Sequence, residues 1–172
     1  MSAESNLDRA MNAIETAFKN EDLSYSRLEE NLAFRIDFES EYGELSCLAQ
    51  IEPEIELFRW YVFLPGTVAA EARLPVAEYL TRVNFGLPVG NFELDFEDGE
   101  VRFKVSMDIE GGELTPTQVN NTIATSLQTV DMYQQGLLAV AGGQLTPEQA
   151  CLEAEAAFGE GHEDCGDEFE HE

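Results

Sequence analysis

Two glycines, Gly86 and Gly90, lie four residues apart just ahead of an alternating apolar run. This is the part of the sequence that most resembles a phosphate-binding loop. A phosphate loop needs its glycines between a strand and the start of a helix, as in GxGxxG or GK[ST] motifs. Neither motif is present in that context, and four acidic residues between positions 93 and 98 would repel a phosphate. We therefore expect no phosphate site. We expect Gly86 to end a helix as a left-handed cap, and Gly90 to begin a strand.

Nucleophilic and acid–base chemistry has few candidate residues. The two histidines, His162 and His171, lie in the C-terminal stretch, where no predicted element would hold them in place for catalysis. Cys47 sits in an alternating run that is typical of a core strand, so a cysteine–histidine pair is not expected. Acidic residues occur throughout the chain, and no pair of them stands out. We expect no catalytic residue and no cofactor, and so not an enzyme.

The C-terminal stretch does bring potential metal ligands close together, namely His162, Asp164, Cys165 and His171. Their spacing matches none of the paired-ligand patterns of structural zinc sites. We expect no structural metal site, with weak adventitious metal binding by this stretch as the alternative. Its glycine breaks and acidic residues predict that residues 159–172 form a disordered acidic tail after a single α+β domain over residues 1–158.

Charge is the unusual feature of the composition, with 35 Asp and Glu against 9 Lys and Arg and a formal net charge of -26. Proteins bind nucleic acids largely through Lys and Arg side chains, which neutralise phosphates and release their counterions. Because this chain is so strongly acidic, we expect no nucleic-acid partner. A negative field favours a basic protein partner. Two alternatives remain open: the charge only keeps the protein soluble, or it mimics DNA for a DNA-binding protein.

The cellular compartment can be predicted from the length of the apolar runs, the N-terminal residues and the cysteines. No apolar run approaches the ~20 residues of a membrane helix, and the N-terminus lacks the basic start and apolar block of a secretory signal. Three scattered cysteines do not form a disulfide framework. We expect a cytoplasmic protein that does not contact membranes.

Hydrophobic periodicity predicts the elements in chain order. A helix is expected over about 5–20, strands over 31–39, 45–52 and 55–65, and a helix opening near Pro75. A hairpin follows, with a two-residue Asp98-Gly99 turn. Two helices then begin at Thr115 and Thr146, each followed by Pro and closed by a capping-box Gln, and the first runs over about 116–141.

The hairpin register can be predicted pair by pair from the two-residue turn. It places Phe96 opposite Val101, Leu94 opposite Phe103, Phe92 opposite Val105, Asp95 opposite Arg102 and Glu93 opposite Lys104. One face would then be apolar, and the other would carry pairs of opposite charge.

The third strand is apolar on both faces. Phe58, Trp60, Val62 and Leu64 alternate with Leu57, Tyr61 and Phe63. Such a strand is central and covered twice, once by the chain's own helices. A second subunit or a partner could supply the other cover, which makes Leu57, Arg59, Tyr61 and Phe63 the predicted interface. Burial beneath further helices explains the same residues equally well.

A longer string resembles a known family. The matching residues are Leu80, Arg82, Asn84, Gly86, the run 90–95, the run 98–102, Asp108, Glu110-Gly111 and the LTPEQA segment 145–150. They resemble the YbjN family of bacterial sensory transduction regulators over roughly residues 30–155. That family is similar in fold to type III secretion chaperones, which are small, acidic, commonly dimeric proteins that hold partner segments and catalyse no reaction.

The elements predicted from the chain follow the order α-β-β-β-α-β-β-α plus a short C-terminal helix. With that order, the resemblance implies an antiparallel α+β sheet with helices packed on it. It also implies a non-enzymatic adaptor that acts as a small acidic homodimer and holds a segment of an unidentified protein partner, which the negative charge favours as basic. It carries over no active-site residue. The alternatives are a small-molecule sensor or enzyme with a pocket between sheet and helices, and an acidic DNA mimic.

Overall fold

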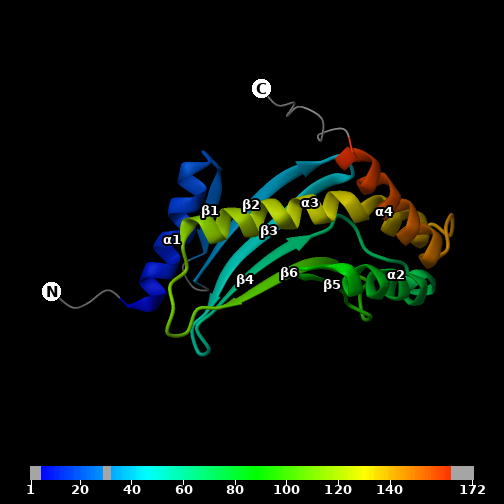
Figure 1. Ribbon diagram of the computed structural model, residues 1–172. Helices are drawn as coiled ribbons and strands as arrows, with labels where there is room; N and C mark the ends of the chain where they lie inside the picture. Colours follow the sequence, from blue (N-terminus) through cyan, green and yellow to red (C-terminus); the bar gives the residue numbers. More distant parts are fainter. Residues whose placement is uncertain (1–4, 29–31, 164–172) are drawn as a thin grey trace, which may run out of the picture.

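The computed structural model describes residues 5–28 and 32–163 (Figure 1). The elements follow in the order α1 (Asn6–Asn20), β1 (Tyr25–Leu28), β2 (Ala33–Ser40), β3 (Gly43–Glu52), β4 (Leu57–Phe63), the 3-10 turn η2 (Ala70–Ala72), α2 (Arg73–Gly86), β5 (Asn91–Leu94), β6 (Val101–Asp108), α3 (Pro116–Ala141) and α4 (Pro147–Glu163). The predicted α+β class and element order are confirmed, with one addition. The four-residue strand β1 was not predicted, because three of its four side chains are exposed and it shows no apolar alternation.

The strands form one six-stranded sheet in the order β1-β2-β3-β4-β6-β5. Every neighbouring pair is antiparallel. The short strands β1 and β5 form the two edges, and β4 lies between β3 and β6, as its two apolar faces predict. Short edge strands limit unwanted pairing with other chains.

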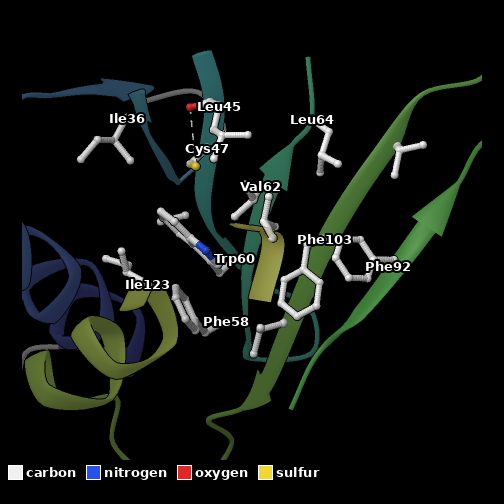
Figure 2. Packing of buried hydrophobic residues seen from close by; sticks show 14 of the residues in the cluster. Ile36, Leu45, Cys47, Phe58, Trp60, Val62, Leu64, Phe92, Phe103 and Ile123 are labelled. Atoms are coloured by element: carbon white, nitrogen blue, oxygen red, sulfur yellow. Dashed lines mark hydrogen bonds between the residues drawn. The ribbon is translucent and has the colours of Figure 1, made fainter. Parts of the chain in front are cut away.

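The helices of the described chain cover one face of the sheet. The long helix α3 crosses that face, with α1 toward one end and α2 and α4 toward the other (Figure 1). The covered face of β4 carries Phe58, Trp60 and Val62, all fully buried. Figure 2 shows these side chains gathered with Phe103 of β6 and Ile123 of α3. Burial of large apolar side chains, at about 1.5–3 kcal/mol each, is the main force that joins sheet and helices.

The helix ends follow their sequence signals. Thr115 accepts a hydrogen bond from the Gln118 backbone N–H, while the Gln118 side chain accepts from the Thr115 N–H, so the predicted capping box is present. Thr146 and Gln149 repeat the arrangement at α4. On α3, Val119 and Val130 are fully buried.

The hairpin register predicted from a two-residue turn is wrong by two residues. Leu94 pairs with Val101 and Phe92 with Phe103, so residues 95–100 form a longer loop. Two interactions outside the hairpin stabilise this loop. The Val68 N–H donates to the Gly99 carbonyl at 2.8 Å, and the Arg73 guanidinium donates to the Phe96 carbonyl at 2.7 Å.

The charged pairs of the hairpin change with the register. Asp95 lies in the loop, so its predicted pairing with Arg102 is wrong, and Arg102 is instead opposite Glu93. The Asp95 side chain accepts a hydrogen bond from the backbone N–H of Glu97 at 2.7 Å. Because the shift is an even number of residues, each strand side chain still lies on the predicted face.

The two glycines of the opening motif differ in role. Gly86 is the last residue of α2 and its φ is not positive, so the predicted left-handed cap is wrong; the chain leaves the helix through an extended Leu87. Gly90 has φ +76°, and a Cβ there would lie 2.4 Å from the Phe103 ring. Gly90 therefore permits the close approach of β5 to β6, as expected of a strand-start residue.

The predictions for the C-terminal stretch fall partly outside the described residues. Helix α4 continues to Glu163, beyond the position 159 at which the acidic tail was predicted to begin. Asp164, Cys165 and His171 of the predicted weak metal-binding stretch lie outside the described residues. In the described part of the chain, no helix is long and apolar enough to cross a membrane.

Candidate partner-binding face of the sheet

The face of the sheet opposite the helices is the candidate site, and we call it the open face. Within residues 5–28 and 32–163, no helix packs on it. Pairing aligns its side chains in rows across the strands. One row runs Arg35, Leu48, Tyr61, Lys104, and the next runs Asp37, Ser46, Phe63, Arg102.

The four predicted interface residues, Leu57, Arg59, Tyr61 and Phe63, all lie on this face along β4. Leu57, Arg59 and Phe63 are half-buried. Leu48 of β3, directly opposite Tyr61, is also half-buried and extends the apolar area. Sequence reasoning missed Leu48 because one leucine in an otherwise polar series did not stand out. The register of β3 on β4 is what brings it to the site.

Tyr61 differs from its neighbours because its own chain buries it, leaving 7% exposed. The Arg102 guanidinium lies over its ring at 4.8 Å from the centroid, and the Phe63 ring stacks beside it at 5.9 Å. A cation over an aromatic ring is attracted by the ring's quadrupole. Tyr61 therefore supports the surface from beneath, while Leu48, Leu57 and Phe63 leave apolar area exposed on the open face.

Ion pairs fix the cations of the open face. Arg59 pairs with Glu52 at 3.0 Å. Glu93 of the edge strand accepts from Arg102 at 2.7 Å and also pairs with Lys104. Burial alone would raise the pKa of Glu93, but the hydrogen bonds from Lys104 and Arg102 outweigh it and hold that pKa below its ordinary value.

The charge of the open face differs from that of the whole chain. On strands β2 to β6 it carries six carboxylates, those of Asp37, Glu39, Glu44, Glu52, Glu93 and Asp108, against four cations, those of Arg35, Arg59, Arg102 and Lys104. The full chain has 35 acidic residues and 9 basic ones. Nearly half of the cations thus lie on one nearly neutral, partly apolar face of a strongly acidic protein. Protein-binding surfaces have this character, since charge is depleted at the core of an interface.

The side chains of the open face are better suited to binding than to catalysis. Its carboxylates and cations are paired with each other or exposed to solvent, and it holds neither cysteine nor histidine. On the opposite face, burial raises the pKa of the Cys47 thiol to about 12, so it remains protonated and unreactive. Among the described residues, no group of three or more His, Cys, Asp and Glu side chains is arranged to hold a metal ion.

Comparison with solved structures places the fold. The E. coli YbjN crystal structure superposes with a TM-score of 0.53 at 14% identity, over 71% of this chain and 86% of that one. ExsC in the ExsC–ExsE complex superposes with a TM-score of 0.54 at 15% identity, over 73% of this chain and 90% of that one. At these identities the likeness shows a shared fold, that of YbjN and of type III secretion chaperones.

Comparison of sequences identifies the family. No curated protein matches the chain in sequence. The family described as "YbjN: Putative bacterial sensory transduction regulator" matches residues 11–139, well over half of the chain. The chain belongs to the YbjN family.

Proposed function

We propose that the protein is a non-enzymatic, chaperone-like regulator that binds a segment of a partner protein on the open face, and that it works as an acidic homodimer. The observation that carries the proposal is the open face itself, with Leu48, Leu57 and Phe63 half-buried and its cations held in ion pairs. Family membership supports a regulatory role. ExsC, which shares the fold, is solved in complex with ExsE, so this architecture can bind another protein.

The net charge and the open face would contribute to partner binding in different ways. A net charge of -26 raises the encounter rate with a basic partner, in a salt-dependent way. The nearly neutral open face then provides contact without a layer of unpaired carboxylates to desolvate. Cys47 and Cys151 are both free thiols, which suits action in the reducing cytoplasm.

The test is partner capture by the tagged full-length protein from lysate of its native cell, at low and high salt. We expect one protein to remain bound at high salt and to be lost with Phe63→Glu. Tyr61 is a poor choice for this test because it is 7% exposed, so a carboxylate there would destabilise the fold itself.

Phe85→Glu is the matched control, since Phe85 is 96% exposed on α2, away from the sheet face. Capture that survives Phe63→Glu and fails with Phe85→Glu would place the contact on the helices instead. Capture that disappears with salt in every variant would point to charge alone. Sedimentation equilibrium tests the dimer, and a mass of 19.1 kDa at all concentrations would contradict it.

A further inference from the structure

A cavity of about 220 Å³ lies between the sheet and the second half of α3. Its walls come from the segment after β4, the start of β6 and α3, and include Leu64, Val68, Val101, Gln134, Leu137 and Leu138. Leu64 is labelled in Figure 2, at the end of β4. Leu138 is 44% exposed, so the cavity reaches the molecular surface beside α3.

The walls of this cavity are held in place by hydrogen bonds. The Leu64 N–H donates to the Val101 carbonyl at 3.0 Å, and the Val68 N–H donates to the Gly99 carbonyl at 2.8 Å. The Arg73 guanidinium donates to the Val68 carbonyl at 3.2 Å. The segment 64–68 is therefore tied to β6, to the hairpin loop and to α2, which preorganises the space it encloses.

Gln134 is the feature that indicates a ligand. Its side chain is 2% exposed, and its carbonyl oxygen Oε1 has no hydrogen-bond partner among the described residues. A buried polar atom without a partner is costly, and most such atoms in folded proteins are satisfied. Apart from Thr67 and Gln134, the side chains of the cavity wall are apolar. The Gln134 amide thus lacks a donor that a bound molecule could supply.

The lining also fixes the chemical class of the ligand. The wall of this cavity contains no charged side chain. The hollow between α3 and α4 includes Glu153, and the hollow beside β2 includes Glu39 and Asp131. An ionised ligand would lose its hydration here without gaining a counter-charge. A dry cavity of ~150 Å³ can hold benzene, so this one has room for one or two rings.

We propose that this cavity binds a small, uncharged, mainly apolar molecule that donates a hydrogen bond to Oε1 of Gln134. Such a site goes beyond partner binding on the open face and does not depend on it. It would give this regulator a means of responding to a small molecule.

Indole and indene test the proposal, since they share a bicyclic shape and only indole has an N–H donor. We would titrate each into the full-length protein and follow the methyl NMR signals of Val68, Val101 and Leu137. We expect saturable shifts at these methyls, with indole bound about 2- to 10-fold more tightly than indene, as one neutral hydrogen bond allows. No saturable shift with either probe would overturn the site.

Gln134→Leu tests the role of the amide. It keeps the size of the side chain and removes the unsatisfied oxygen, so the protein should remain folded by circular dichroism. Indole and indene should then bind equally well. Gln135→Leu, at the neighbouring exposed position, should leave the preference for indole unchanged. A preference for indole that survives Gln134→Leu, or equal binding by the unmodified protein, would overturn the assignment of Gln134.

Discussion

Gly136 lies in the interior of α3, where it faces Tyr79 of α2. Helix propensity alone predicts that Gly136→Ala stabilises the protein, by about 0.8–1 kcal/mol. The structure predicts the opposite. A Cβ on Gly136 would lie 2.4 Å from the Tyr79 hydroxyl oxygen and 2.9 Å from the ring carbon that carries it, and Tyr79 is fully buried.

The cost has two parts. Overpacking a well-filled interior costs about 1–3 kcal/mol. A shifted Tyr79 would also lose the 2.9 Å hydrogen bond that its hydroxyl donates to the Tyr133 carbonyl, which adds about 1 kcal/mol. After subtracting the propensity gain, we expect Gly136→Ala to lower the free energy of unfolding by about 1–3 kcal/mol. For a chain of this size that corresponds to a fall in Tm of about 2–12 °C.

Thermal and urea unfolding, followed by circular dichroism, measure this change. Gly86→Ala is the matched control, because nothing lies within 4 Å of a Cβ there and its φ is not positive; we expect it to be neutral or slightly stabilising. In a Tyr79→Phe background, Gly136→Ala should cost less, since the closest contact is gone. A Gly136→Ala protein more stable than the parent would refute the argument that α2 and α3 touch here.

Three further predictions concern the edge of the sheet. The Asn84 side chain accepts from the Phe92 N–H at 2.7 Å and donates to the Phe92 carbonyl at 3.0 Å, so Asn84→Ala should cost about 1–3 kcal/mol in urea unfolding. A cost near zero would show that water replaces both bonds. Gly90→Ala should lower Tm, because φ is +76° and the new Cβ would meet the Phe103 ring; an unchanged Tm would contradict that contact. The depressed pKa of Glu93 means that its contribution to stability is complete above the ordinary glutamate pKa and is lost as pH falls through the lower folded value. Glu93→Gln should therefore reduce the loss of stability between neutral and acid pH, and an identical pH profile would refute this.

Sequence reasoning predicted the elements better than it predicted their ends. Periodicity and caps act locally, so α1, α3 and the strands β2 to β4 could be derived from the chain alone. The hairpin register could not, because Arg73 and Val68, distant in sequence, fix the loop 95–100. Strand β1 was missed for a related reason: its stability comes from pairing with β2 and not from its own pattern.

The candidate site shows the same limit. An alternating strand that is apolar on both sides identified β4 as central and gave Leu57, Arg59, Tyr61 and Phe63, which lie together on the open face. What each contributes depends on neighbours in other strands. Arg102 of β6 lies over Tyr61 and takes it out of reach of a partner, whereas Leu48 of β3 joins the apolar area. Cross-strand register was needed to assign these roles.

The pairing of charges on the open face bears directly on how the proposed partner would be selected. Arg59, Arg102 and Lys104 already have carboxylate partners within the chain, so an incoming acidic group gains little from them while meeting the repulsion of the whole molecule. A basic group is attracted at long range but finds no unpaired carboxylate at the apolar centre of the face. A segment that combines a basic flank with apolar side chains satisfies both conditions, because the flank can interact with the acidic surround while the apolar part covers Leu48, Leu57 and Phe63. Salt would then act mainly on the association rate, and substitutions at the apolar centre mainly on the dissociation rate.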